Sequence, residues 1–225
     1  LAHAAGKDPK DFLLELLGPD RIVDPAKAGV AGEPWNYDRS FEDFPIDIAR
    51  YRRVVELAAE KSGWGRSLPK GRGRGIAVHR SFVSFVATVI EVEVKADGSR
   101  TIPRVDVAVD AGTLAHPERV RAQMEGATIM GLGNTLVGEI TFKAGRTVQS
   151  NYTDYQVARM DAAPRELAVH LVPSTALPGG VGEPGVPPVA PALCNAIFAA
   201  TGRRIRSLPV AKQLAPAVAS TAGRR

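Results

Sequence analysis

The stretch from residue 76 to residue 110 constrains the fold most, because its side chains alternate with a period of two. One face of its first half carries Thr88, Ile90, Val92 and Val94, and the other carries Glu91, Glu93 and Lys95. The Asp97-Gly98 pair is a strong signal for a tight hairpin turn, and the alternation resumes beyond it in Val105, Val107 and Val109. We therefore expect a half-buried antiparallel pair of strands.

Helical patterns flank this hairpin on both sides. Asp8 and Pro9 are placed to cap and open a first helix. Its buried face is expected to hold Phe12, Leu13, Leu16 and Leu17. A longer helix is expected over residues 46–62, and a third opens at His116. Helices are followed by two strands, a helix, further strands, a loop and a last helix, which predicts an α+β fold with a mixed or antiparallel sheet packed against helices.

A loop of glycine and proline from residue 178 to residue 188 precedes the last helix. Its glycines are expected to take positive φ angles and to lie close to other atoms, while its prolines stiffen the same segment. The residues concerned are Gly179, Gly180, Gly182, Gly185, Pro184, Pro187 and Pro188. The carboxylate in this loop belongs to Glu183. By itself, the pattern is equally explained by a tight strand-to-helix connection in which Glu183 is simply exposed.

The helix that opens at His116 contains an unusual amount of glycine. Gly126, Gly131 and Gly133 each cost about 1 kcal/mol relative to alanine. Close approach of another backbone or of a bulky ligand is the usual compensation. Gln123 lies next to Met124, an inward position of the helical pattern, so the pattern alone assigns Gln123 to the solvated face.

Composition disfavours several classes of site. Cys194 is the only cysteine, which rules out an intramolecular disulfide and a multi-cysteine metal site. Segment 63–75 is expected to be a basic glycine-rich loop, and it lacks the Gly-Lys-Ser/Thr ending of a phosphate-binding loop. No apolar run reaches the roughly 20 residues needed to span a bilayer. His79 is assigned a packing role and Asp110 a turn-capping role.

The net charge of +5 is mild and gathers toward the C-terminus, where we expect residues 210–225 to form a basic, flexible tail. Such a tail is the only feature in favour of a small nucleic-acid-binding protein. Because no aromatic residues are interleaved with its arginines, we expect no nucleic-acid partner.

Three blocks in order along the chain resemble one family. They are VAVDAGTLAHPERVRAQMEGATIMGLG, SNYTDYQVARMDAAP and GGVGEPGVPPVAPALCNAIFAATGRRIRSLP. Together they are similar to the C-terminal part of the molybdopterin-binding large subunit of the xanthine oxidase/aldehyde oxidase family, and most similar to the isoquinoline 1-oxidoreductase β-subunit type. Residues 1–209 are therefore expected to be the C-terminal part of a molybdopterin-binding domain, with the fold of that domain, in a fragment that lacks the upstream half.

The resemblance implies roles for four residues. Glu183 matches the glutamate that is the general base of this family, which takes a proton from a metal-bound hydroxyl while hydride passes to the molybdenum centre. Gln123 matches the glutamine beside the cofactor, and Gly126 and Gly182 are assigned to the same cofactor contact. In this family the pterin, and not protein side chains, holds the molybdenum, so no metal ligand is expected in the chain.

The resemblance also implies cofactors and partners. We expect a molybdopterin-dependent oxidoreductase that hydroxylates an N-heteroaromatic or aldehyde carbon with water and is inactive without its missing half. Its cofactor is expected to be molybdenum-molybdopterin in the cytosine dinucleotide form, and its electrons to leave through 2Fe-2S clusters on a small iron–sulfur subunit. The alternative is a truncated or split-gene product that acts only as an assembly partner. Since relatives of this type are often exported folded, the periplasm is favoured over the cytoplasm.

Overall fold

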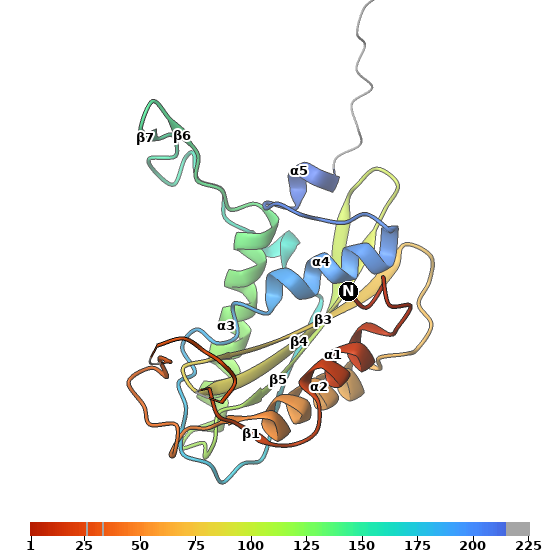
Figure 1. The fold of residues 1–225 in the computed structure, drawn as a ribbon. Coiled ribbons are helices and arrows are strands. Elements are labelled where there is room, and N and C mark those ends of the chain that lie inside the picture. The colour runs from red at the N-terminus through yellow and green to blue at the C-terminus, as the bar shows by residue number, and fades with distance from the viewer. Residues whose placement is uncertain (26, 33, 215–225) are drawn as a thin grey trace, which may run out of the picture.

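The computed structural model of the protein describes residues 1–25, 27–32 and 34–214. Its centre is a four-stranded sheet in the order β3-β4-β5-β8 (Figure 1). The strands are β3 Arg72–Ser81, β4 Ser84–Val94, β5 Arg100–Asp110 and β8 Glu166–Leu171. Neighbours in β3-β4-β5 are antiparallel, whereas β8 runs parallel to β5. The predicted α+β class with a mixed sheet is thus confirmed.

The hairpin turn at Asp97-Gly98 joins β4 to β5, but the strands are not half-buried as expected. Every residue of β4 from Ser84 to Val92 is buried. Glu91, assigned to a polar outer face, is only 6% exposed. Its carboxylate pairs with the guanidinium groups of Arg72 and Arg74 on β3, at 3.4 and 2.9 Å. The alternation identified the strand but not its burial, because paired charges can occupy a covered face.

A second turn, which the sequence patterns do not indicate, joins β3 to β4. Phe82 and Val83 form it with positive φ angles of 48° and 59°. Such angles normally call for glycine or asparagine, so the usual turn signals are missing here. The Phe82 ring stacks on Tyr37 at a centroid distance of 4.8 Å, and Tyr37 stacks in turn on Trp35. This aromatic column holds the long connection before residue 46 against the end of the sheet.

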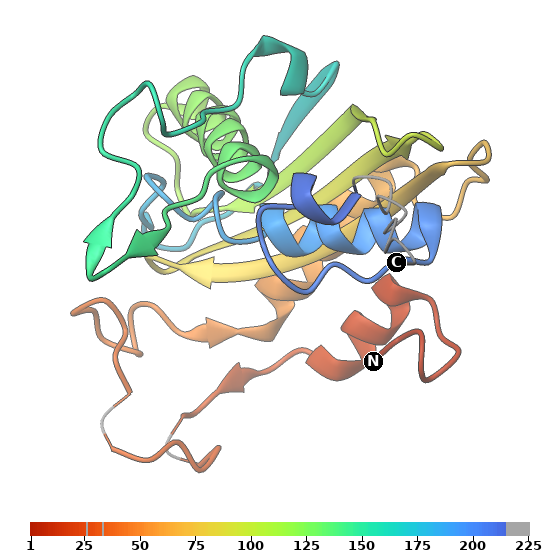
Figure 2. The ribbon, with the colours of Figure 1, turned by 90° about the horizontal axis from the view of Figure 1, so that it is seen from above.

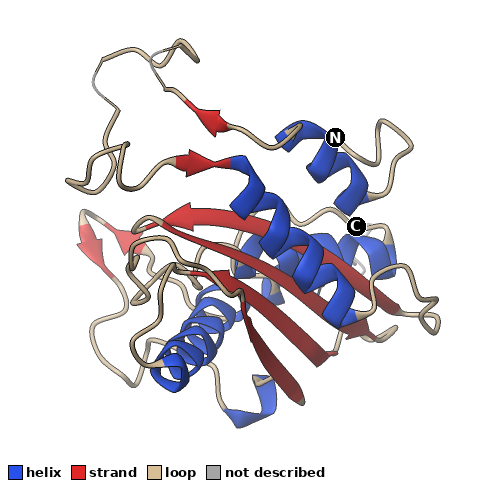
Figure 3. Ribbon diagram, turned by 90° about the horizontal axis from the view of Figure 1, so that it is seen from below, coloured by secondary structure: helices blue, strands red, loops and turns tan. Residues whose placement is uncertain are grey.

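Helices cover both faces of the sheet, which explains the burial of its central strand (Figure 2). On one face, α1 Pro9–Leu17 and α2 Ile48–Ser62 pack against Phe85 and Val89. On the other, α3 Pro117–Leu136 and α4 Val189–Thr201 form a larger core with strand residues such as Ile90. Figure 3 shows α2 lying across the strands.

Local signals placed the helix ends well. Asp8 caps α1 by accepting hydrogen bonds from two amides of its first turn, and His116 caps α3. The residues of α1 that pack on the core are Leu13, Leu14 and Leu17. The assignment of Leu16 to the buried face was wrong, because this side chain is 62% exposed.

Short elements complete the described chain. Their bounds are β1 Ile22–Val23, β2 Ile46–Asp47, β6 Phe142–Lys143, β7 Arg146–Thr147, the 3-10 helix Met160–Ala162 and α5 Ala211–Leu214. The β6-β7 hairpin projects from the body, as Figure 1 shows. Val210 and Leu214 are buried in the core beside α3 and α4. The tail expected from residue 210 thus begins as packed chain, and residues 215–225 lie outside the described residues.

The expectation that segment 63–75 is entirely loop was wrong, because its last residues belong to β3. At Gly73 and Gly75 the backbone of α4 lies directly on the strand, although neither glycine has a positive φ. A Cβ atom at either position would come within 3.0 Å of backbone atoms of α4, among them those of Ala196. The two glycines therefore allow backbone contact between α4 and β3.

We expect Gly75→Ala to lower the free energy of unfolding by about 3 kcal/mol or more, because the added methyl group would overlap main-chain atoms that cannot rotate away. Gly126→Ala is the matched control. Nothing lies within 4 Å of a Cβ built at Gly126, so alanine should raise the free energy of unfolding by about 1 kcal/mol through helix propensity. Denaturant unfolding of the two variants measures both effects, and equal stabilities would contradict the packing role of Gly75.

Candidate functional site

The loop from residue 178 to residue 188 is fixed to the sheet by its backbone. The Gly179 amide donates to the Ala111 carbonyl at 2.9 Å, and the Gly180 amide donates to the Phe82 carbonyl at 2.8 Å. None of the loop glycines has a positive φ, so that part of the prediction was wrong. Close approach is what they provide: a Cβ at Gly180 would lie 2.7 Å from the Phe82 Cβ.

The same loop then meets α3. A Cβ at Gly185 would lie 2.8 Å from the Ala127 Cβ and 3.1 Å from the Met124 sulfur. One turn further along the helix, Gly131 gives similarly close access to Val189, the first residue of α4. The loop is therefore held by the sheet at one end and by α3 and α4 at the other.

Glu183 projects from this anchored segment and is exposed. Within the described chain its carboxylate makes no hydrogen bond and no ion pair, and its carbonyl accepts from the Val186 amide at 2.9 Å. The space around Gly182 is also open, with nothing within 4 Å of a built Cβ. A free carboxylate thus stands on a fixed backbone, beside a residue that leaves room for another group.

Gln123 and Gly126 are exposed on α3 and, three residues apart, share one face of the helix. The Gln123 amide has no hydrogen-bond partner among the described residues, and nothing lies within 4 Å of a Cβ at Gly126. Because Gly185 contacts Met124, the loop that carries Glu183 lies against the turn of α3 that carries Gln123. These residues fit the pterin cofactor that the resemblance implies: an unpaired amide suits its polar edges, and two bare glycines leave room for it.

The pattern did not identify the apolar residues that continue this face. Ile129 and Met130 follow Gly126 on α3 and are 40% and 63% exposed. Their position outside the inward face of the helical pattern could have identified them, because large apolar residues on an outer face often mark a surface that a ligand or another part of a protein covers.

A histidine–aspartate pair forms a cluster of ionisable groups on the opposite face of the sheet. His170 Nε2 lies 2.9 Å from Asp106 Oδ1, and Arg104 donates to both oxygens of that carboxylate at 2.6 and 2.8 Å. Burial acts to raise the pKa of Asp106, but the hydrogen bonds from His170 and Arg104 outweigh it and hold that pKa below its usual value. Asp106 is fully buried, and Arg104 also donates to the backbone carbonyl of Lys61 at the end of α2, so this cluster supports the fold on the side away from Glu183.

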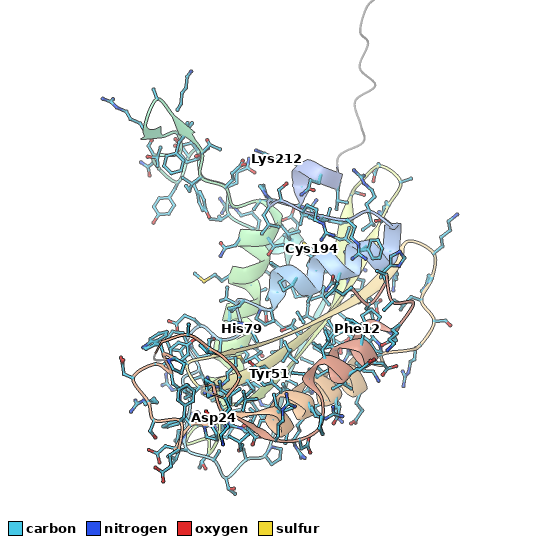
Figure 4. The ribbon with its side chains drawn as sticks, in the orientation of Figure 1. Phe12, Asp24, Tyr51, His79, Cys194 and Lys212 are labelled. Carbon is cyan, nitrogen blue, oxygen red and sulfur yellow. The ribbon has the colours of Figure 1, made fainter. Side chains whose placement is uncertain are left out.

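Three residues singled out in the sequence have packing roles. Asp110 accepts from the Gly112 amide at 3.1 Å, as expected of a turn cap, and also binds the Arg50 guanidinium at 2.6 Å. Burial lowers the pKa of His79, and burial raises the pKa of the Cys194 thiol. Figure 4 shows His79 on β3 and Cys194 on α4.

In residues 1–25, 27–32 and 34–214, no group of three or more histidine, cysteine, aspartate and glutamate side chains gathers in a way that could hold a metal ion. No helix in the described ranges is both long enough and apolar enough to cross a membrane.

Comparison with known families gives a direct match. Residues 23–164 match the model of the molybdopterin cofactor-binding domain. This region includes β3, β4, β5 and α3, and hence Gln123 and Gly126, and it ends before the loop that carries Glu183.

Individual relatives extend over more of the chain. It is 36% identical over 217 residues to the membrane-bound aldehyde dehydrogenase [pyrroloquinoline-quinone] of Gluconacetobacter polyoxogenes, covering 93% of this chain and 26% of that protein. It is 36% identical over 167 residues to the isoquinoline 1-oxidoreductase subunit beta of Brevundimonas diminuta, covering 72% of this chain and 21% of that protein. The aldehyde oxidoreductase of Desulfovibrio gigas matches 56% of this chain and 14% of its own at 26% identity, with a TM-score of 0.48. The chain thus spans about a quarter or less of the length of these relatives.

The ionisation of Asp106 gives a prediction about pH. Because its pKa is lower in the folded chain than in the unfolded chain, the unfolded chain binds more protons once the pH falls below about 4. This contribution to the free energy of unfolding is therefore present above that pH and lost as the pH falls through the folded-state pKa. Asp106→Asn should destabilise the chain by about 3 kcal/mol at neutral pH and should reduce its acid dependence. Urea unfolding over a pH series tests this, and the same acid dependence in both proteins would contradict it.

The seating of the loop is tested with two of its glycines. Gly185→Ala should lower the free energy of unfolding by about 1–3 kcal/mol, because the methyl group would press on Ala127 and Met124. Gly182→Ala should change it by less than about 0.5 kcal/mol, since the space there is open. Thermal or denaturant unfolding measures the difference, and a loss at Gly182 equal to that at Gly185 would refute this placement of the loop.

Proposed function

Since the chain belongs to the molybdopterin cofactor-binding family of xanthine oxidase-type molybdenum-binding subunits, we propose that it forms part of a molybdenum hydroxylase in which Glu183 is the general base. The family assignment from the three sequence blocks is confirmed by the domain match and by the curated relatives. The role of Glu183 is our proposal.

One observation carries this proposal. Among the described residues the Glu183 carboxylate is exposed and has no partner, and its loop is hydrogen-bonded to Ala111, just after β5, and to the β3-β4 turn, and packs on α3 at Gly185. A general base must be ionised at working pH and held within hydrogen-bond reach of the proton that it accepts. A free carboxylate on an anchored backbone supports this role, because its position is fixed by the loop contacts and its oxygens are available for the proton.

The other site residues are given supporting roles. The Gln123 amide can donate and accept at the polar edges of a pterin, so we assign it to orienting the cofactor. Gly126 and Gly182 are proposed to leave room for the cofactor, since a side chain at either position would occupy open space. When bound, the molybdenum cofactor would supply the two-electron oxidation of the substrate carbon, with water as the source of oxygen. Glu183 would take up the proton that this reaction releases at its carboxylate.

Several finer features of the function extend from the relatives. The matched names include an aldehyde dehydrogenase and an isoquinoline 1-oxidoreductase, so we propose an aldehyde or an N-heteroaromatic compound as the substrate. We further propose that electrons leave through a small iron–sulfur subunit, that the cofactor is the cytosine dinucleotide form, and that turnover requires the remaining part of the molybdenum-binding subunit. The partial coverage of the relatives supports the last point.

The name of one relative points to a second possible cofactor, pyrroloquinoline quinone. The Gluconacetobacter relative is named for pyrroloquinoline quinone, whereas the matched domain model is one for molybdopterin. We favour molybdopterin because the domain model covers the central strands and α3. Metal analysis and quinone extraction of the purified complex separate the two, and bound quinone without molybdenum would overturn the proposal.

The alternative role is that of an assembly partner without a catalytic group of its own. Such a chain would fold and associate with its complementary part, but substitution of Glu183 would have no effect on turnover by the complex.

We expect Glu183→Gln to lower kcat by about 10²–10⁴-fold in the assembled enzyme, because glutamine keeps the size of the side chain and removes its ability to accept the proton. Molybdenum content should stay at the parent level. Glu125→Gln, on an exposed carboxylate of α3, is the matched control and should retain normal turnover. Near-parent turnover of Glu183→Gln at equal molybdenum content would eliminate Glu183 as the base.

A further inference from the structure

The strand β3 is an edge strand, paired with β4 on one side only. Its register with β4 is uninterrupted from Arg72 to Ser81, so alternate residues direct their backbone groups toward β4 and away from it. Three hydrogen bonds fix which residues face away. The Gly71 carbonyl accepts from the Val94 amide, on the β4 side. The Arg72 amide donates to the Pro69 carbonyl and the Ile76 carbonyl accepts from the Asn195 side chain, both away from β4.

It follows that Arg74, Ile76 and Val78 present their amides on the free edge of the sheet. These three amides make no hydrogen bond within the described part of the chain. Natural proteins usually cover or interrupt such an edge, because it is a template for another strand. The arginine at position 74 does not supply a free repelling charge, since it is paired with Glu91.

This edge forms the floor of a cleft of about 550 Å³. Residues Arg74 to Val78 lie at the floor, Phe12 and Leu16 of α1 line one wall, and Phe198 and Ala199 of α4 line the other. Residues 1–3 and Lys7 also line the cleft, and the His3 ring meets the Phe198 ring at a centroid distance of 5.0 Å. Figure 1 shows α1 and α4 on either side of the sheet at β3, and Figure 4 shows Phe12 on α1. The exposure of Leu16, which the sequence pattern had placed in the core, is explained by its position on this wall.

The dimensions and chemistry of the cleft fit an extended peptide. Its floor of five strand residues is about 16 Å long. In an added strand, successive side chains would point alternately to the α1 wall and to the α4 wall, and both walls are apolar. At the rim, the Arg204 guanidinium lies over the Phe198 ring and has no ion-pair partner among the described residues. A carboxylate at the end of an apolar strand would complete this arrangement.

We propose that an extended segment of the molybdenum-binding subunit, from outside residues 1–225, adds to the free edge of β3 as a fifth strand. This inference rests on the proposed function, in which the chain works together with the rest of such a subunit. The relatives are about four or more times longer than the matched region, so they contain ample chain to supply the segment. A second copy of this chain does not fit, because its own β3 is recessed between α1 and α4 in the same way.

The segment is sought with ten-residue peptides that overlap along the part of the Brevundimonas diminuta subunit that this chain does not match. Binding to the folded chain is measured by fluorescence anisotropy, and amide hydrogen exchange reports its position. We expect at least one peptide with a mainly apolar centre and an acidic end to bind. It should slow exchange of the Ile76 and Val78 amides at least tenfold and leave the Ala77 amide, which faces β4, unchanged.

Two variants at one position separate backbone pairing from side-chain contact. Val78→Pro removes an outward-facing amide, which edge strands tolerate, and should weaken peptide binding at least tenfold. Val78→Ala also shortens the side chain but keeps the amide, so its affinity should stay within about threefold of the parent, because the pairing that we propose is made by the main chain. Circular dichroism checks that both variants are folded.

A change to the peptide gives the same test with the parent chain. Methylating alternate amide nitrogens of a bound peptide should abolish binding in one of the two possible registers and spare it in the other, because only one edge of the peptide faces β3. The proposal is overturned if no peptide binds, if Val78→Pro and Val78→Ala bind alike, if both methylated peptides bind alike, or if the Ile76 and Val78 amides are protected by self-association instead. Since no cofactor or turnover is involved, these outcomes are independent of the test of Glu183.

Discussion

Backbone contact between α4 and β3 is the constraint on which the rest of the structure depends. It requires glycine at positions 73 and 75, and it places α4 across the sheet with the Asn195 side chain bonded to the Ile76 carbonyl. Because α4 begins at Val189, beside Gly131 of α3, this contact also fixes the C-terminal end of the Glu183 loop. The position of the proposed base is therefore set by small residues more than 100 positions earlier in the chain.

Much of the fold could be predicted because its signals are local. The caps at Asp8 and His116, the Asp97-Gly98 turn and the strand at Val105, Val107 and Val109 depend on neighbours in the sequence, and they appear where expected. The two-sided burial of β4 and the parallel pairing of β5 with β8 depend on segments far apart in the sequence. Alternation of side chains within one strand cannot predict which strands will pair. It also cannot predict the burial of Glu91, because that residue is paired with arginines from another strand.

In the candidate site, too, local features could be predicted from the sequence, whereas contacts between distant segments could not. Glycine and proline marked a loop that the structure anchors at both ends, but the loop glycines are needed for contact with Phe82, Met124 and Ala127, not for a left-handed backbone. The family resemblance, and not periodicity, singled out Gln123 and Glu183, since both are simply exposed polar residues by pattern. The Asp106–His170 pair was missed because its members are 64 residues apart and meet only through the parallel pairing of β5 and β8.

The parallel placement of β8 has a consequence for the order in which the chain acquires its structure. The β3-β4-β5 meander closes through short turns, whereas β8 must return to β5 across the whole of α3 and the β6-β7 hairpin. Contacts between distant segments carry a larger loop-closure cost and form later than local ones. The Glu183 loop lies between β8 and α4, so it belongs to the last part of the sheet to assemble. During synthesis Glu183 is made after β3, β4, β5 and α3 but before α4, so its loop would be fixed at both ends only once α4 has packed on β3.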